Sequence, residues 1–378
     1  MVNALPSPVL VTGAAGVLGS NLTDRLLSAG AEVVAYDRRE VPPADRLRAV
    51  TGDVRDRGEL TRAASGCRAI VHCAAALPSY PRAEIRSITV GGAESVLEAA
   101  AAARAERLVH ISSTAVYGLP ERVPTPEDHP HEPVDAYSAA KAEAERAVAA
   151  RAAERCTSIV RPKTFLGPGR LGLFGMLFEW AEEGRDFPII GKGDVRIQML
   201  DLGDLVEAVA TVLAAPDETA ADTYNIGAAD FATIREDFQA VLDAAGHGRR
   251  VRSLPTGPAV AALRLASAAG LSPVYDRLVR KLKADSYVDI SKARERLGFT
   301  PRHSNREAVL RTYRWWRSLP QSDPGAAGAT SADRWKQGLL ASAKVCFPAR
   351  AKGTVKGRAH DQHQDRGTLT GRDRAGPA

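Results

Sequence analysis

The sequence predicts a doubly wound parallel α/β sheet, followed by a smaller lobe and a C-terminal tail. In the first half of the chain, short β-branched runs alternate with amphipathic helical patterns, as in parallel sheets that carry helices on both faces. The glycine-rich segment VTGAAGVLG joins the first predicted strand to the first predicted helix. Sheets that bind dinucleotides have this kind of turn, so the sequence predicts a cofactor together with the fold.

The individual elements follow from the spacing of the apolar residues. Buried strands appear as short continuous apolar runs, whereas helices have apolar positions three or four residues apart. We expect strands at Pro8–Thr12, Glu32–Tyr36, Leu47–Gly52, Ala69–Cys73, Arg107–Ser112 and Thr157–Arg161, and helices at Gly16–Ser28, Gly58–Ala64, Glu84–Ala103 and Ala136–Arg155. Gly30 is placed to end the first helix, because glycine adopts positive φ angles without strain.

The domain organisation changes after this alternating region, where shorter elements are separated by Gly-Pro loops. We expect residues 1–165 to form a dinucleotide-binding domain. Residues 166–320 are expected to form mainly a discontinuous substrate-binding lobe, with segments that return to the first domain. This lobe would close over the carboxyl edge of the sheet, where open α/β sheets bind ligands.

The rest of the chain, residues 321–378, has the composition of a basic, disordered tail. It carries ten Lys and Arg against five Asp and Glu, so the net charge of +6 arises mainly here and does not predict nucleic-acid binding. Trp335–Phe347 has the pattern of a short amphipathic helix that would dock on a partner or an anionic surface. Composition favours a solvated extension. We expect deletion of residues 325–378 to leave the melting temperature and the activity almost unchanged.

Cysteine usage and apolar run length indicate the compartment. The four cysteines form no CxxC or Cys/His cluster, which argues for reduced thiols and against a metal site. The N-terminal segment has no charged signal-peptide region, and no apolar run has the length of a membrane span. We therefore expect a cytoplasmic protein that binds a small molecule, has no membrane span and binds neither metal nor nucleic acid.

Three glycines shape the predicted cofactor turn. Gly13, Gly16 and Gly19 follow the spacing GxxGxxG, which lets the backbone approach a pyrophosphate at the N-terminus of the helix, near Val17 and Leu18. The alternative is a turn that only packs the helix against the strand.

Acidic residues predict how the adenosine is bound. Asp37 ends the second predicted strand, where a carboxylate accepts hydrogen bonds from the ribose hydroxyls and repels a 2′-phosphate, so NAD is predicted over NADP. Arg38 and Arg39 keep NADP open, because an arginine there can hold that phosphate. Asp53, followed by Val54, either accepts a hydrogen bond from the adenine amino group or caps the next helix.

The segment DAYSAAK places Tyr137 and Lys141 four residues apart, on one face of a predicted helix. A free tyrosine titrates near pH 10, so a tyrosine base at neutral pH needs about 4 kcal/mol of preferential phenolate stabilisation. The Lys141 ammonium and an oxidised nicotinamide supply charge of the right sign. A YxxxK motif alone is a weak functional signal, because helices rich in Lys and Tyr produce it by chance. After a dinucleotide-binding motif, however, the pair predicts hydride chemistry.

Taken in order, the motifs resemble the extended short-chain dehydrogenase/reductases, specifically the NAD-dependent epimerase/dehydratase family. The similar segments are TGxxGxxG, the acidic Asp37, GDVRD around Asp53, VHCAA at 71–75, SSTAVYG at 112–118, YSAAK at 137–141, RP at 161–162, NIG at 225–227 and DISKARERLGFTPR at 289–302. The resemblance covers about residues 8–316. It implies a Rossmann-type fold, NAD as the cofactor and, by analogy with relatives, helices that pair across the two-fold axis of a homodimer. Residues 321–378 lie outside it.

The resemblance also implies roles for individual residues. Tyr137 would be the general acid/base, and Lys141 would lower its pKa and hold the nicotinamide ribose. Ser113, or Thr114 in its place, would hydrogen-bond the reacting oxygen, while Ser112 is expected to satisfy backbone groups. The further implied positions are Ala74, Ala75 and Pro162 for the cofactor, and Lys163, Thr164 and Arg196 for the substrate.

Departures from the family pattern narrow the function. Members that dehydrate sugar nucleotides carry an Asp-Glu pair where this chain has Thr114 and Ala115, so we do not expect dehydration. Many epimerases have Asn where Thr164 stands. The family's NVxG motif appears in this chain as TVGG at residues 89–92, with Thr89 in place of its Asn. The cationic Lys163 and Arg196 predict an anionic substrate, unless both are surface charges.

Three functions are compatible with these residues. The leading hypothesis is an NAD-dependent epimerase that acts on a nucleotide sugar by transient oxidation to a keto intermediate and hydride return. The alternative is an NAD(P)-dependent dehydrogenase or ketoreductase of a keto-sugar or another secondary alcohol. A non-catalytic dinucleotide sensor would normally have lost the tyrosine or the lysine, and both are present.

Overall fold

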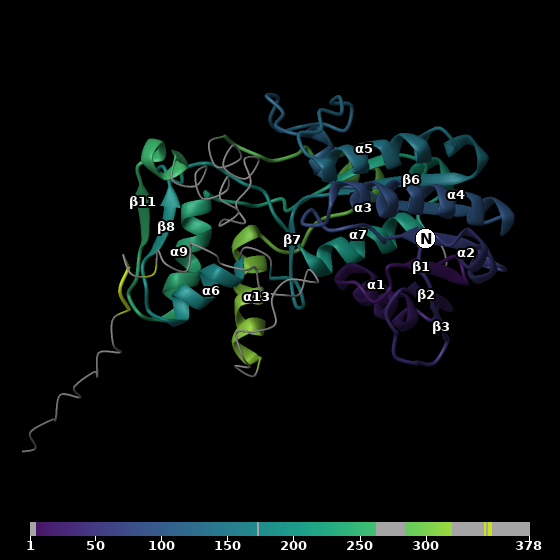
Figure 1. Ribbon diagram of the computed structural model, residues 1–378, viewed down its shortest axis with the longest axis horizontal. Helices are drawn as coiled ribbons and strands as arrows, with labels where there is room; N and C mark the ends of the chain where they lie inside the picture. The colour runs from purple at the N-terminus through teal and green to yellow at the C-terminus, as the bar shows by residue number, and fades with distance from the viewer. Residues whose placement is uncertain (1–4, 172–173, 262–283, 320–343, 345–346, 350–378) are drawn as a thin grey trace, which may run out of the picture.

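The computed structural model describes residues 5–171, 174–261, 284–319, 344 and 347–349 (Figure 1). The sheet and its helices lie at one end of the view in Figure 1, and the second lobe lies at the other end. None of the helices in these ranges is both long and apolar enough to cross a membrane.

A parallel sheet forms the first part of the molecule. Its strands are β1 (Val9–Thr12), β2 (Val33–Asp37), β3 (Leu47–Thr51), β4 (Ala69–His72), β5 (Arg107–Ile111), β6 (Cys156–Pro162) and β10 (Thr223–Ile226). They form a seven-stranded sheet in the order β10-β6-β5-β4-β1-β2-β3, and each pairing is parallel. The predicted fold class is confirmed. The strand order reverses between β1 and β4, where sheets of this type bind ligands.

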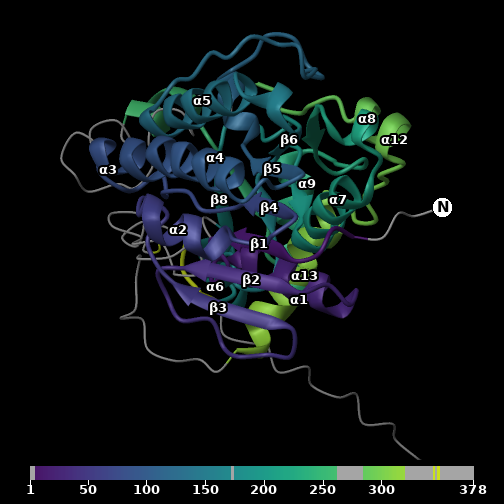
Figure 2. The same cartoon turned by 90° about the vertical axis from the view of Figure 1, so that its right-hand side faces the viewer.

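Helices cover both faces of the sheet (Figure 2). On one face, α1 (Val17–Ser28) packs against α7 (Leu202–Ala214). On the other face, α2 (Arg57–Ala64), α4 (Gly92–Ala102) and α5 (Ala136–Ala149) pack side by side. The strands between them are buried on both sides, so their apolar residues are continuous rather than alternating.

Two predicted helices are interrupted. The helix expected at Glu84–Ala103 is α3 (Arg82–Arg86), a π-helical turn at Ser87–Gly91 and then α4. The helix expected at Ala136–Arg155 ends at Ala149 and is followed by a 3₁₀ turn at Ala152–Glu154. Close packing places a glycine at the first junction, because a Cβ on Gly92 would lie 2.8 Å from the Val54 side chain.

The second lobe has its own aromatic core. Its elements are α6 (Phe174–Glu182), β8 (Phe187–Ile190), α9 (Ile234–Ala245), β11 (Val251–Leu254) and α13 (Asn305–Ser318). Phe178, Trp180 and Trp316 are buried among them. Capping boxes start α9 and α13, which satisfies their first backbone N–H groups. The remaining elements are η2 (Thr114–Tyr117), β7 (Phe165–Leu166), β9 (Leu200–Asp201), α8 (Asp217–Ala220) and α12 (Ser291–Leu297).

Part of the C-terminal extension contacts this lobe. Only Lys344 and residues 347–349 of the extension are described, and the remainder of the predicted Trp335–Phe347 helix lies outside the described residues. The Phe347 ring centroid lies 5.8 Å from that of Trp180. Arg185 Nη1 donates hydrogen bonds of 2.8 Å to the Lys344 and Phe347 carbonyls. Lys344 and Phe347 are therefore packed on the lobe, whereas residues 348–349 are exposed.

We predict that Phe347→Ala lowers the free energy of unfolding by about 1–2 kcal/mol, because it removes a half-buried ring from an aromatic core. Urea denaturation measures the change. Leu319→Ala is the control, since Leu319 is 39% exposed and its loss should cost less than about 0.5 kcal/mol. Equal unfolding midpoints for the two variants would contradict the prediction.

Candidate functional site

The glycine turn between β1 and α1 leaves no room for side chains. A Cβ on Gly13 would lie 2.8 Å from the Ala74 backbone nitrogen, and one on Gly19 would collide with the Gly13 carbonyl. Gly13 also has a φ angle of 71°. In this fully described segment no side chain caps the N-terminus of α1, which begins at Val17. The first N–H groups of α1 are therefore open to a pyrophosphate.

Asp37 lies at the end of β2, beside this turn. Its Oδ2 accepts a hydrogen bond of 3.0 Å from the Ala15 N–H, and its Oδ1 accepts one of 2.9 Å from the Arg39 N–H. The Arg38 guanidinium points to Asp53, at 3.8 Å. A carboxylate held by backbone groups thus lies where the sequence predicts a contact with the ribose hydroxyls of the adenosine. This position fits NAD as the cofactor.

Asp53 is ion-paired rather than used as a helix cap. Arg55 Nη2 lies 2.6 Å from Asp53 Oδ2, and this pairing lowers the pKa of the Asp53 carboxyl. The cap of α2 is Asp56, whose Oδ1 accepts a hydrogen bond of 2.9 Å from the Glu59 N–H. The helix-cap alternative for Asp53 is therefore wrong, and its contact with adenine stays a prediction.

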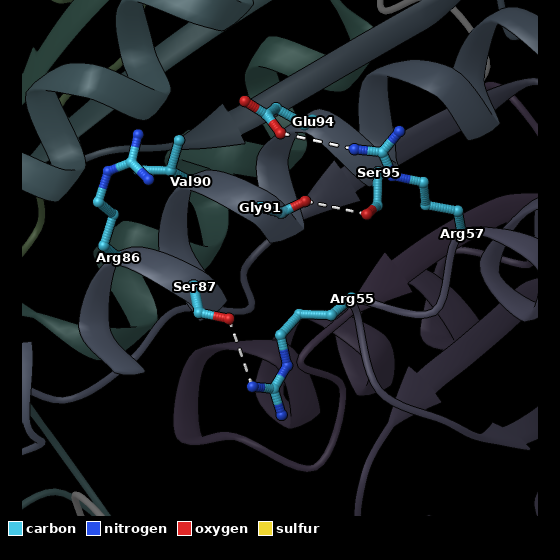
Figure 3. Close-up of a pocket in the computed structure, with 8 residues that line it drawn as sticks. All are labelled: Arg55, Arg57, Arg86, Ser87, Val90, Gly91, Glu94 and Ser95. Carbon is cyan, nitrogen blue, oxygen red and sulfur yellow. Dashed lines mark hydrogen bonds and ion pairs between the residues drawn. The ribbon is translucent and has the colours of Figure 1, made fainter. Parts of the chain in front are cut away.

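A cavity of about 200 Å³ opens beside this ion pair, at the start of α4 (Figure 3). Arg55, Arg57 and Arg86 line it, but each guanidinium has a carboxylate partner. Arg57 lies 2.6 Å from Glu98, and Arg86 lies 2.5 Å from Glu143. Because its charges are neutralised and no predicted catalytic residue lines it, we place the reactive centre elsewhere.

Tyr137 and Lys141 lie in the first half of α5. A capping box fixes the start of this helix, with the Ser138 N–H donating a hydrogen bond of 2.7 Å to Asp135 Oδ1. The Tyr137 side chain is partly exposed, while Lys141 is buried. Lys141 Nζ donates a hydrogen bond of 2.7 Å to the Ile111 carbonyl at the end of β5. The pair is thereby brought to the hydroxyl cluster that follows β5.

The three clustered hydroxyls have different partners. Ser112 is buried and donates a hydrogen bond of 2.6 Å to Glu145 Oε2, so the expectation that it serves backbone groups is wrong. Ser113 Oγ accepts a hydrogen bond of 3.1 Å from the N–H two residues later and caps η2. Thr114 Oγ1 donates to the Pro162 carbonyl at 3.3 Å. The turn η2, which Ser113 caps and Thr114 begins, packs on α5, the helix that carries Tyr137.

The surroundings of Lys141 determine when it is charged. Burial lowers the pKa of Lys141 to about 8, although Cys73 and Glu145 favour the ammonium form. Burial also lowers the pKa of the neighbouring His72 and His110, to about 3 for His110. Both histidines are thus neutral at physiological pH, and Lys141 supplies the positive charge.

A buried ion pair beneath the site was missed by the sequence reasoning. Arg161 Nε lies 2.9 Å from Glu145 Oε1, and His131 Nε2 lies 3.2 Å from the same oxygen. Burial alone would raise the pKa of Glu145, but His131, Arg161 and Ser112 hold it at about 2. Arg161 also donates a hydrogen bond of 2.6 Å to the Tyr117 hydroxyl. This network joins α5 to β6 directly behind Lys141.

The two cations predicted for the substrate differ in environment. Lys163 is buried, and its Nζ donates hydrogen bonds of 2.9 Å and 3.1 Å to Ser286 O and Oγ. A small pocket brings Lys163 together with Thr114. Arg196 is half-exposed and pairs with Asp285 Oδ2 at 2.9 Å, so its charge is already balanced.

The other predicted residues are placed as follows. Thr164 is exposed, Pro162 is buried at the end of β6, Val54 is buried under α4, and Ala75 is half-buried after β4. Asp201, Asp204 and His303 form a group with the spacing of metal ligands. Backbone N–H groups and Arg311 already engage these carboxylates, so we read the group as a helix cap.

Arg170 is a further residue that sequence reasoning missed. It follows Gly169, whose φ angle is 80° and whose Cβ would lie 3.6 Å from Val17 Cγ2. Arg170 Nε donates a hydrogen bond of 3.1 Å to the Phe165 carbonyl, and its guanidinium lies 4.0 Å from the Phe165 ring centroid. The guanidinium also interacts electrostatically with Tyr137. The segment GPGR, which follows Lys163 and Thr164, was the available signal.

Comparison with known proteins assigns the chain to a family. The model of the NAD dependent epimerase/dehydratase family matches residues 9–227. The chain belongs to this family. NAD is accordingly its cofactor, and the open N-terminus of α1, the glycine turn and Asp37 fit that cofactor.

Relatives in the family have several activities. Protein y4nG of Sinorhizobium fredii, named as uncharacterized, is 36% identical and covers 88% of this chain and 84% of its own. The 3 beta-hydroxysteroid dehydrogenase/Delta 5→4-isomerase of Mycobacterium tuberculosis is 30% identical, and the match covers 82% of this chain and 90% of that protein. UDP-glucose 4-epimerase of Vibrio cholerae is 26% identical, and the match covers 82% of this chain and 95% of that protein. The structure of Bordetella bronchiseptica WbmG with NAD and UDP has a TM-score of 0.66 at 25% identity. The match covers 82% of this chain and 94% of that chain.

We predict that kcat/KM falls as the pH rises through about 8, because Lys141 then loses the charge that favours a Tyr137 phenolate. Below that pH the ammonium is retained and the effect is absent. A kcat/KM profile at constant ionic strength measures this limb, with the melting temperature recorded at each pH as the control for folding. Undiminished kcat/KM at pH 10 would contradict the role of Lys141.

For stability, we predict that Glu145→Gln lowers the free energy of unfolding by about 3–5 kcal/mol, because Arg161 loses its buried counter-charge. Glu143→Gln on the same helix is the matched control. Glu143 pairs with Arg86 at the surface, so its loss should cost less than about 1 kcal/mol. Chemical denaturation at neutral pH compares the two, and equal losses would refute the prediction.

Proposed function

We propose that this protein is an NAD-dependent epimerase that acts on a nucleotide sugar by transient oxidation to a keto intermediate. The observation that carries the proposal is the arrangement on α5. Lys141 is buried and anchored to the Ile111 carbonyl, and it lies one helical turn from the partly exposed Tyr137. The glycine turn and the Ser113 cluster lie at the same edge of the sheet.

Each residue has a defined part in the proposed reaction. The Tyr137 phenolate takes the proton of a substrate hydroxyl, and Lys141 makes the phenolate accessible near neutral pH. Ser113 donates a hydrogen bond to the reacting oxygen. When bound, NAD supplies a reversible hydride acceptor. After the keto intermediate has turned in its pocket, its carbon would receive the hydride back on the opposite face while Tyr137 returns the proton to the oxygen, which completes the inverted alcohol.

The residues that would hold the cofactor surround the β1–α1 turn. The N–H groups at the start of α1 would bind the pyrophosphate, and Asp37 would accept from the ribose hydroxyls. Asp53 would accept from the adenine amino group, while the Ala74 and Ala75 backbones would line the path. Lys141 would hold the nicotinamide ribose.

The substrate class is supported by relatives and by local charge. The relatives include a UDP-glucose 4-epimerase and a protein whose structure contains UDP. Lys163 is the better candidate for contact with an anionic substrate, because it is buried beside Thr114 whereas Arg196 is already paired. Thr114 and Ala115 supply no carboxylate, which disfavours dehydration. A homodimer through α4 and α5 remains part of the proposal by analogy.

The second candidate is a dehydrogenase or ketoreductase. One observation favours it: the mycobacterial hydroxysteroid dehydrogenase is 30% identical over most of both chains. Tyr137, Lys141 and Ser113 serve this reaction equally well, so the two candidates differ in whether the cofactor is exchanged. The non-catalytic sensor has less support, since the intact Tyr137 and Lys141 would serve no purpose in it.

The test is turnover of UDP-sugars by purified, NAD-loaded protein without added cofactor. We expect epimers to interconvert with no net NADH. Tyr137→Phe should reduce turnover by at least about 100-fold and leave NAD affinity within about twofold, because only the proton-transfer group is lost. The matched control is Tyr80→Phe, a tyrosine outside the predicted site.

Two results would overturn the proposal. Net NADH formation that requires added NAD would establish the dehydrogenase instead. Wild-type turnover by Tyr137→Phe would end the assignment of Tyr137 for either reaction.

A further inference from the structure

Arg170 has no counter-charge among the described residues. Arg107 and Arg161, which are buried whereas Arg170 is half-buried, pair with the carboxylates of Asp217 and Glu145. No ion pair joins Arg170 to a described acidic residue, and its one described side-chain hydrogen bond runs from Nε to the Phe165 carbonyl. A guanidinium has five N–H donors, so the remaining ones are available to a ligand.

The environment of Arg170 disfavours an uncompensated charge. Its guanidinium packs on the Phe165 ring, and burial lowers the pKa of Arg170. Withdrawing an unpaired guanidinium from water is costly, and a bound anion would recover that cost through charge-assisted hydrogen bonds. This is the arrangement expected of an arginine whose counter-charge is supplied by a bound anionic ligand.

The backbone holds Arg170 at the reactive edge of the sheet. A Cβ on Gly167 would lie 2.6 Å from the Leu202 side chain, and Gly169 packs close to Val17. The Arg170 N–H closes the turn by donating a hydrogen bond of 3.0 Å to the Gly167 carbonyl. Gly169 thus places the turn beside the start of α1, and the Arg170 guanidinium interacts electrostatically with Tyr137.

We infer that Arg170 binds a carboxylate that the substrate carries close to the hydroxyl deprotonated by Tyr137. The inference rests on the proposed function in taking Tyr137 as the acid/base. The diphosphate of a nucleotide sugar projects from the anomeric carbon toward the nucleotide, so an anion beside Tyr137 belongs to the sugar itself. The planar guanidinium fork matches a carboxylate. The substrate class is therefore an acidic sugar, such as a nucleotide-linked hexuronic acid.

Binding to NAD-loaded Tyr137→Phe protein, which cannot turn over, tests the inference by calorimetry. The probes are UDP-glucuronate against UDP-glucose, and glucuronate against glucose. We expect each acid to bind at least about 10-fold more tightly than its neutral partner, as the loss of a hydrogen bond to a charged group implies. Adding Arg170→Leu should abolish this preference while changing the affinity for the neutral sugars less than about twofold.

Two further variants separate binding from structure. Arg170→Lys keeps the charge without the fork and should retain part of the preference, and it serves if the leucine variant does not fold. Arg62→Leu removes an exposed arginine on α2 and should change neither affinity. An effect of equal size on both UDP-sugars in Arg170→Leu would indicate a diphosphate contact and overturn the inference.

The outcomes also distinguish the inference from the proposed function. If the protein binds neither UDP-sugar, the nucleotide-sugar function fails and the glucuronate and glucose pair decides the role of Arg170. No preference for glucuronate in that pair, including no detectable binding, overturns the inference. If both UDP-sugars bind equally well, the proposed function stands and the carboxylate site fails.

Discussion

The hydrogen bond from the Lys141 ammonium to the Ile111 carbonyl is the contact on which the rest of the site depends. It joins the middle of α5 to the carboxyl end of β5, and so sets the position of Tyr137 relative to the hydroxyls after β5. One turn further along the helix, Glu145 binds Ser112 and Arg161. Because both contacts are buried, water does not weaken them, and α5 cannot shift along the sheet without leaving a charge unpaired.

The cofactor side of the site obeys a different constraint, which is steric. The β1–α1 turn runs so close to Ala74 that Gly13 has no space for a Cβ. This turn leads into the N-terminus of α1, which has no side-chain cap. The helix dipole there favours a pyrophosphate. Polar contacts thus set the reactive end of the site, and close backbone packing sets the end that binds the cofactor.

Much of the fold was predictable, because buried parallel strands appear as continuous apolar runs. The strands from β1 to β6 were all expected, as were the glycine turn and the placement of Tyr137 and Lys141 on one helix. The π-helical turn before α4 was not predicted. At its junction with α4, Gly92 packs on Val54, a contact between residues far apart in the sequence that apolar spacing does not reveal. β10 was missed because it lies after the region of alternating strands and helices, and only its pairing with β6 identifies it as a strand of the sheet.

The site was predictable where chemistry follows local spacing and unpredictable where it depends on contacts between distant residues. Nothing in the sequence pairs Glu145 with Arg161 and His131, or Arg196 with Asp285. Those partners decide which charges are balanced, and hence which cations are available to a substrate. Arg170 stands out only once its neighbours are known, because an arginine after GPG looks like any other loop charge.

The place of β10 at the edge of the sheet bears on how the chain folds during synthesis. β10 pairs with β6, and α7 covers the face of the sheet beside α1, yet both come from the second half of the chain. A fragment that stops near residue 165 would leave β6 as an open edge and expose the apolar surface that α7 covers. The nascent sheet therefore stays incomplete until residues beyond Ile226 have left the ribosome, and in that interval it has an exposed edge on which other chains can aggregate.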